Sequence, residues 1–186
     1  SISVEIYPAV TVNGLCANAF ISRVANVDVA TDREEALRRL APFHEKARED
    51  LGFAGMPFLT AEQVHGDGVA IVGETSASPV SGVDALVTNR PNVCLGIYVA
   101  DCCAVYIVDP VNGAIGLAHS GKKGTERGVL GAVLRKMECA YGTEPEQVIV
   151  QLSPCIRPPH YEVDFAAEIC RQAREAGVKE VIDPGD

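Results

Sequence analysis

Short apolar runs separated by turn residues organise the middle of the chain. Residues 93–100, 104–108 and 114–118 are predominantly apolar, and each run has the length of a buried strand. Between the second and third runs lies Asp109-Pro110-Val111-Asn112-Gly113, a sequence typical of a turn. The pattern therefore predicts a β-hairpin formed by the second and third runs.

The same kind of pattern predicts strands and helices on both sides of this hairpin. Further strands are expected at residues 3–7, 17–22, 58–64, 69–72 and 147–152. Helices are expected at residues 32–51, 125–141 and 164–176. Asp32 and Asp164 are typical N-cap residues for the first and last of these helices. Strands that come in pairs and also alternate with helices favour an α+β fold with mixed β-sheets and helices packed outside.

Length and composition indicate one globular domain over residues 1–186. The chain is long enough for one substantial core and short for two, and 47% of its residues are hydrophobic. No apolar run approaches the roughly 20 residues that cross a membrane, and the first residues lack the pattern of a signal peptide. We therefore expect a cytoplasmic protein without a membrane partner. The net charge of −9 argues against a nucleic-acid partner.

Cysteine and histidine side chains stand where predicted strands end. Cys102 and Cys103 separate two apolar runs, His119 directly follows the third, and His65 precedes Gly66 in a QVHG sequence. Successive side chains of an extended chain point to opposite faces, so only one of the two cysteines is expected to share a metal with the histidines. One cysteine and two histidines leave a fourth position open, which is the ligand count of a catalytic zinc site.

Several segments, in this order along the chain, resemble the motifs of the laccase-domain or YfiH-like family, whose members have been called multicopper polyphenol oxidases and purine nucleoside phosphorylases. They are QVHG (63–66), DALVTNRP (84–91), ADC (100–102), DPVNGAIGLAHSGKKG (109–124), and SPCI with YEV (153–163). The resemblance begins at about Asn18. It implies His65, Cys102 and His119 as metal ligands and leaves Cys103 for the core. It also implies a central β-sandwich flanked by helices, similar to the deamidase domain of cytotoxic necrotizing factors.

The chain departs from the family pattern at a few positions. Lys122-Lys123 stand where the family usually has Trp-Arg, and Ala104 stands in a region that usually contains proline. Ser153 replaces a glycine before Pro154. The family's C-terminal segment is absent, so we expect a domain truncated at its C-terminus relative to the family. These differences bear on the choice of substrate more than on the fold or the metal site.

The number of histidines favours zinc over copper. A blue-copper site takes two histidines and a cysteine, and a multicopper enzyme needs a further histidine cluster. The chain has four histidines, and two of them, His44 and His160, match no metal motif. We therefore expect a zinc cofactor and disfavour polyphenol oxidase activity.

Other residues near these ligands are candidates for catalysis and substrate binding. Asp101 either orients a ligand or acts on the substrate, unless it is a turn residue. Lys122 and Lys123 lie where a strand gives way to a helix, a place that favours phosphate or a carboxylate. Arg23 matches the arginine of an early family motif and is expected to join them. Cys155 follows a predicted strand and is expected to line the pocket.

The resemblance implies zinc-dependent phosphorolysis of purine nucleosides (adenosine, inosine, guanosine or methylthioadenosine), with adenosine deamination as a second reaction because zinc activates water. One alternative is a metal-free amide hydrolase or deamidase, of which cell-wall precursor editing would be an example. In that enzyme Cys102 is the nucleophile and His119 the base, and His65 has no role. The other alternative is a zinc-binding domain that has lost its activity.

Overall fold

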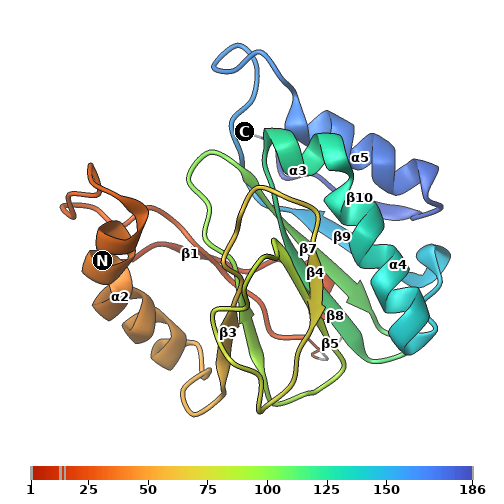
Figure 1. Cartoon of the computed structure of the whole chain (residues 1–186), viewed down its shortest axis with the longest axis horizontal. Coiled ribbons are helices and arrows are strands. Elements are labelled where there is room, and N and C mark those ends of the chain that lie inside the picture. The colour runs from red at the N-terminus through yellow and green to blue at the C-terminus, as the bar shows by residue number, and fades with distance from the viewer. Residues whose placement is uncertain (1, 13, 15, 186) are drawn as a thin grey trace.

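A mixed β-sheet forms the centre of the molecule. The computed structural model describes residues 2–12, 14 and 16–185, and within them six strands pair in the order β10-β9-β7-β8-β5-β4 (Figure 1). The strands are β4 Val69–Ile71, β5 Ala85–Thr88, β7 Cys103–Asp109, β8 Ala114–Ser120, β9 Ile149–Leu152 and β10 Glu180–Ile182. The pairs β5–β8, β7–β8 and β7–β9 are antiparallel, whereas β4–β5 and β9–β10 are parallel. The expected mixed sheet is confirmed.

The predicted hairpin is the longest strand pair of this sheet. β7 and β8 pair from Cys103↔Ser120 to Asp109↔Ala114. Gly113 closes the turn with φ 63°, a backbone conformation that favours glycine. The Asp109 carboxylate accepts hydrogen bonds from the N–H groups of Val111 and Asn112, which holds the turn in shape. The hairpin thereby fixes the positions of the residues at its open end.

Helices cover one face of the sheet (Figure 1). The apolar sides of α4 (Val129–Tyr141) and α5 (Phe165–Glu175) belong to the buried core on this face. α4 packs on β8 and β5, α5 packs on α4 and β10, and α3 (Lys122–Arg127) precedes α4. The prediction of a single helix at 125–141 is wrong at its start, where the structure has two helices. Gly128, with φ 74°, is the left-handed C-cap that ends α3, and α4 begins at the next residue. No helix in the part of the chain described is long and apolar enough to cross a membrane.

Two small sheets and a helix lie on the other side of the central sheet (Figure 1). The sheets are β1 (Val4–Glu5) with β2 (Phe20–Ile21), and β3 (Phe58–Thr60) with β6 (Cys94–Gly96). The helix is α2 (Arg33–Asp50). A short helix, α1 (Pro8–Thr11), packs on Val108 and Ile149 of the central sheet, and a 3-10 turn, η1 (Pro145–Gln147), precedes β9. Leu59 and Val93 pack on Leu86 of β5, so β3 and β6 supply a second layer. This layering agrees with the expected α+β fold.

The remaining predictions differ from the structure mainly in length. The helices expected at 32–51 and 164–176 are confirmed as α2 and α5, and the carboxylates of Asp32 and Asp164 cap them. The strand expected at 58–64 ends at Thr60, because the turn that follows contains residues with positive φ. The strands expected at 3–7, 17–22 and 93–100 are also shorter, and β5, β10 and α1 were not predicted.

Candidate functional site

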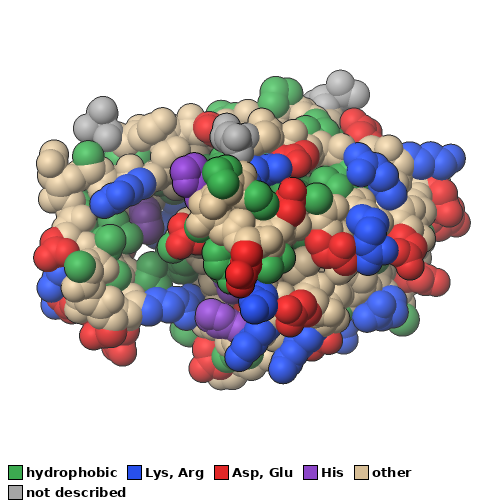
Figure 2. Space-filling view, turned by 90° about the horizontal axis from the view of Figure 1, so that it is seen from above, with side chains coloured by type: hydrophobic (Ala, Val, Ile, Leu, Met, Phe, Trp, Pro, Cys, Tyr) green, Lys and Arg blue, Asp and Glu red, His purple; other side chains and the backbone are tan. Residues whose placement is uncertain are grey.

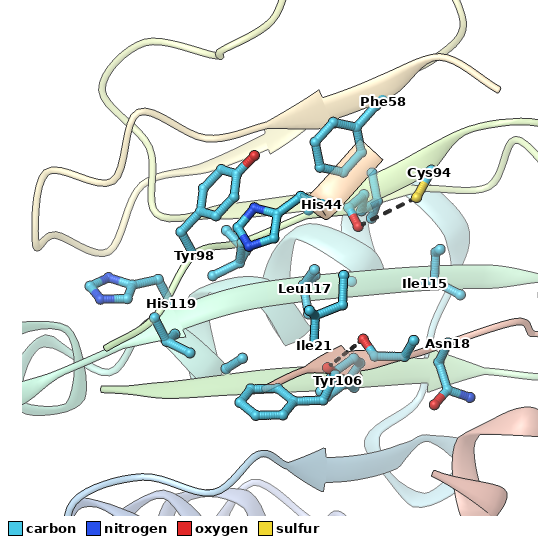
Figure 3. A pocket seen from close by; sticks show the side chains of 18 of the residues that line it. Asn18, Ile21, His44, Phe58, Cys94, Tyr98, Tyr106, Ile115, Leu117 and His119 are labelled. Atoms are coloured by element: carbon cyan, nitrogen blue, oxygen red, sulfur yellow. Dashed lines mark hydrogen bonds between the residues drawn. The ribbon is translucent and has the colours of Figure 1, made fainter. Parts of the chain in front are cut away.

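A large cavity separates α2, β3 and β6 from the central sheet. Its volume is about 1730 Å³, and Figure 2 shows a hollow on this side of the molecule, with histidine and hydrophobic side chains at it and Arg or Lys side chains beside it. Ile115, Leu117 and His119 alternate along β8 and line the cavity (Figure 3). His44 of α2 stacks on Tyr98, with ring centroids 5.8 Å apart. The cavity thus combines apolar walls, a stacked aromatic pair and, at one end, His119, the next-to-last residue of β8.

Asp84 connects the two predicted histidine ligands. This carboxylate is fully buried immediately before β5 and accepts hydrogen bonds from the N–H groups of Val64 (2.9 Å), His65 (3.1 Å) and Gly66 (2.9 Å). It also contacts Nδ1 of His119 at 2.8 Å. Because one buried carboxylate holds both the backbone of the His65 turn and the His119 ring, the two imidazoles lie close together, with ring centroids 5.5 Å apart in an edge-to-face arrangement.

A glutamine side chain ties the same turn to the segment that leads to Cys102. Nε2 of Gln63 donates to the carbonyl of Tyr98 at 2.7 Å, and the Tyr98 N–H donates to Oε1 of Gln63 at 2.8 Å. Gln63 and His65 have φ values of 62° and 65°, which are uncommon for residues with a side chain. The hydrogen bonds to Asp84 and Tyr98 compensate the conformational cost of this turn.

The environment of Asp84 and His119 sets their protonation. Burial would raise the pKa of Asp84, but hydrogen bonds from Gly66, His119 and Val64 outweigh it, and the net pKa lies below its ordinary value. Burial lowers the pKa of His119, although Asp84 opposes this. An ionised Asp84 beside a neutral His119 places the imidazole proton on Nδ1 and leaves the lone pair on Nε2. Nε2 is therefore the atom of His119 that is available to a metal or a substrate.

Cys102 lies at the same end of the cavity. Ala104 pairs with His119 in the hairpin, so Cys102, two residues earlier, belongs to the same face of the sheet, whereas Cys103 is fully buried in the helix-side core. A Cβ added to Gly121 would lie 2.6 Å from the Cys102 sulfur and 4.0 Å from Cε1 of His119. Glycine is thus required for the thiol to occupy this position. Burial, followed by the charge of Asp101, raises the pKa of the Cys102 thiol.

The donor chemistry of His65, Cys102 and His119 fits a zinc ion. Two imidazoles bound to one zinc at about 2.0–2.1 Å have ring centroids about 5 Å apart, close to the 5.5 Å observed for the two histidines. A carboxylate on the second ring nitrogen, as Asp84 provides, is the usual partner of a zinc-bound histidine. In the described ranges no three His, Cys, Asp or Glu side chains already form a group that could hold a metal. His65 is exposed, so its ring can turn toward the other donors without repacking the core.

The other predicted site residues divide into two groups. Asp101, Arg23 and Cys155 line the cavity. Lys122 and Lys123 are exposed on α3 and are not among the lining residues described. The structure therefore brings the first three to the cavity and leaves the two lysines outside it.

Three residues of the site were not predicted from the sequence. The carboxylate that contacts His119 is Asp84, whereas Asp101, the predicted ligand-orienting residue, is exposed. Gln63 fixes the turn, and Arg33 of α2 lines the cavity while donating a hydrogen bond to the carbonyl of Glu62. A signal for Asp84 was present, because a carboxylate directly before a continuous apolar strand is expected to be buried and must be satisfied there.

Comparison with known proteins agrees with the resemblance noted from the sequence. A family model described as multi-copper polyphenol oxidoreductase laccase matches residues 14–183. A protein of Deinococcus radiodurans named purine nucleoside phosphorylase is 34% identical over 170 residues, which are 88% of this chain and 65% of that protein. Another of the same name from Streptomyces griseus is 36% identical over 129 residues, 67% of this chain and 52% of that protein. The chain thus spans about half to two thirds of the length of these relatives.

Solved structures show the same fold. YlmD from Geobacillus stearothermophilus superposes with a TM-score of 0.68 at 24% identity, and YfiH from Bacillus licheniformis with a TM-score of 0.70 at 20% identity. Each match covers 85% of this chain and 73% of the other. At these identities the likeness concerns the fold alone, and the assignment to a family rests on the match of the family model over most of the sequence. The chain belongs to the family described as multi-copper polyphenol oxidoreductase laccase.

Proposed function

We propose that this chain carries out zinc-dependent phosphorolysis of purine nucleosides, with His65, Cys102 and His119 as the zinc ligands. The observation that carries the proposal is the 2.8 Å contact between Asp84 and Nδ1 of His119, made by the same carboxylate that holds the His65 turn. Such an arrangement prepares two imidazoles for one metal. The names of the relatives support purine nucleosides as the substrate class.

The residues around the ligands suit a nucleoside and a phosphate. A zinc ion held there would supply Lewis-acid chemistry at the substrate. The apolar wall of β8 and the stacked pair of His44 and Tyr98 suit a flat, largely apolar purine. Arg23 and Arg33 line the cavity and suit phosphate, since guanidinium groups bind its oxygens in pairs. In phosphorolysis a phosphate oxygen bonds to the sugar carbon while the bond to the base breaks, and the base leaves with the electron pair.

Deamination of adenosine is part of the proposal as a second reaction. It requires the same three zinc ligands, because a zinc ion with an open coordination position can either activate water for hydrolysis or orient an oxygen atom of the substrate. It needs no phosphate, so the two reactions are separated by omitting phosphate. The partner of the site in both reactions is a small molecule.

A thiol hydrolase is the second candidate, favoured by the closeness of Cys102 and His119 to Gly121. In such an enzyme His119 would take the proton of the Cys102 thiol. The raised pKa of that thiol argues against this role, because an efficient nucleophile needs a lowered pKa. The hydrolase also gives no function to His65, although Asp84 holds its turn in place.

The proposal is tested with the purified chain and a panel of purine nucleosides. Zinc and copper are measured by elemental analysis, and reactions with and without phosphate are followed by chromatography. We expect zinc rather than copper, free base and sugar phosphate when phosphate is present, and no product after removal of the metal by a chelator. Phenol oxidation by a copper-loaded protein, or a chelator-resistant amidase that thiol alkylation inactivates, would contradict the proposal.

A further inference from the structure

The segment that follows β9 runs beside the start of β7. The N–H of Ser153 donates to the carbonyl of Ala104 at 2.9 Å, and the N–H of Ile156 donates to the carbonyl of Asp101 at 2.8 Å. These two bonds continue the antiparallel pairing of β7 with β9 beyond the end of the sheet. Cys102 and Cys103 lie between these two bonds on the β7 side, and Cys155 lies between them on the segment after β9. Three cysteines are therefore close together at one end of the sheet.

Cys103 and Cys155 are the closer partners among these cysteines. The Cys103 sulfur lies 3.6 Å from the carbonyl oxygen of Ser153 and 4.0 Å from its hydroxyl, two residues before Cys155. Both cysteines pack on the helix-side core, and their thiols share a hydrogen bond. The continued register sets Cys155 opposite Cys102 and Cys103 opposite Pro154, so Cys103 and Cys155 are diagonal neighbours. Their thiol contact brings the two sulfurs together, and a disulfide between them requires a local adjustment of the loop after β9.

The two thiols differ in access. Cys103 is fully buried, whereas Cys155 is half-buried and lines the cavity. An oxidant that enters the cavity therefore meets Cys155 first. Cys102 also lines the cavity, but the thiol that hydrogen-bonds to Cys155 is that of Cys103.

We propose that Cys103 and Cys155 form a site of reversible thiol oxidation, independent of the proposed nucleoside chemistry. With a peroxide as oxidant, the Cys155 sulfur attacks one peroxide oxygen, the O–O bond breaks, and Cys155 becomes a sulfenic acid. The Cys103 sulfur then attacks the Cys155 sulfur, the S–O bond breaks, and water leaves as the disulfide forms. Overall, two thiols and one hydrogen peroxide give one disulfide and two waters. A dithiol reductant restores both thiols.

The disulfide would join the loop after β9 to the start of β7. It closes a long loop of the chain, since Cys103 and Cys155 are far apart in the sequence. A disulfide that closes such a loop restricts the unfolded state, so the oxidised protein is expected to melt about 5–15 °C above the reduced protein.

The test uses the full chain with Cys139→Ser, because Cys139 is exposed and would link two molecules. This protein is treated with hydrogen peroxide, its remaining thiols are alkylated, and peptides are analysed by mass spectrometry without reduction. We expect a peptide that links Cys103 to Cys155, and loss of two titratable thiols. Dithiothreitol should reverse both changes and the rise in melting temperature.

Two variants in the Cys139→Ser background decide the assignment. Cys155→Ser should abolish both the linked peptide and the oxidant-dependent rise in melting temperature, and Cys103→Ala should do the same. Cys170→Ala, which removes another buried core thiol, should leave both intact. A link between Cys102 and Cys155, or sulfinic acid at Cys155 without any link, would overturn the proposal.

Discussion

The Asp84 carboxylate accepts a hydrogen bond from Nδ1 of His119, while the Asp84 backbone carbonyl accepts one from the His119 N–H, each at 2.8 Å. The backbone bond extends the antiparallel pairing of β5 with β8, so the sheet itself fixes the distance between the two residues. The same carboxylate holds the turn at His65. The sheet thus positions the site through one buried acid.

Replacing this acid should weaken the site without removing a proposed ligand. In Asp84→Asn, the amide has one acceptor oxygen in place of two and no charge, so several N–H groups lose their partner. We expect zinc affinity to fall about 10–100-fold and the free energy of unfolding of the metal-free protein to fall by about 2–4 kcal/mol. Competition with a chromophoric chelator and urea denaturation measure the two effects.

The matched control is Asp101→Asn, which changes an exposed carboxylate at the same end of the cavity. It should alter the free energy of unfolding by less than about 0.5 kcal/mol. Equal losses of zinc affinity in the Asp84 and Asp101 variants would show that Asp84 has no special role.

A methyl group at Gly121 should displace Cys102. The added Cβ would lie 2.6 Å from the Cys102 sulfur, closer than any normal contact, so the thiol must move. We expect Gly121→Ala to lower zinc affinity at least about 10-fold, as loss of ligand orientation does elsewhere. Gly131→Ala is the control, because its Cβ meets only the flexible end of Arg135 at 3.2 Å and alanine favours the helix. Unchanged affinity in Gly121→Ala would remove Cys102 from the ligand set.

Acid should destabilise the metal-free protein in the range where histidine titrates. Burial lowers the pKa of His44 and of His119, so below about pH 6.5 the unfolded chain binds more protons than the folded chain. The free energy of unfolding should therefore fall as the pH drops from about 7, by at most about 1.4 kcal/mol per pH unit for each histidine. The low pKa of Asp84 acts in the same direction, but only below about pH 4.

Urea denaturation at a series of pH values measures this dependence. His44→Gln, which cannot be protonated, should show a smaller slope between pH 7 and pH 5. A free energy of unfolding that stays constant or rises over this interval would contradict the assignment of neutral, buried histidines.

Phosphate use should depend on the arginines of the cavity. Arg23→Gln removes a charge that lines the cavity, and we expect the KM for phosphate to rise about 10-fold or more with little change in zinc content. Initial rates at varied phosphate measure this effect. Lys122→Ala with Lys123→Ala is the comparison: an effect of the lysine pair alone would favour the prediction made from the sequence, and an effect of Arg23 alone would favour the cavity.

Much of the fold followed from local patterns. Two continuous apolar runs on either side of a turn that contains Asn112-Gly113 predicted the central hairpin, and two N-cap aspartates marked helices that the structure confirms. The sequence pattern did not predict that α3 and α4 are separate helices that meet at Gly128. A glycine inside a segment of helical periodicity is compatible with one continuous helix or with two. Strands as short as β5 and β10 have too few residues to display a period.

The candidate site was predictable where the chain order itself brings residues together. The hairpin register accounts for Cys102 and His119, and the opposite directions of Cys102 and Cys103 follow from strand geometry. The role of Asp84 depends on long-range pairing of β5 with β8, which no local pattern reveals. The sequence places Lys122 next to His119, but no local pattern shows on which side of the sheet its side chain lies. Only the structure shows that Lys122 is not among the residues that line the cavity.

The most direct test of the zinc site is the metal content and turnover of His65→Asn. Asparagine tolerates the positive φ of this position, so the turn held by Asp84 should survive while the imidazole is lost. The control is His160→Asn, which removes an exposed histidine that also lines the cavity. The wild type and His160→Asn should each bind about one zinc per chain and turn over purine nucleosides, whereas His65→Asn should lose both zinc and turnover. An active, zinc-free His65→Asn protein would contradict the zinc site and favour a hydrolase based on Cys102 and His119.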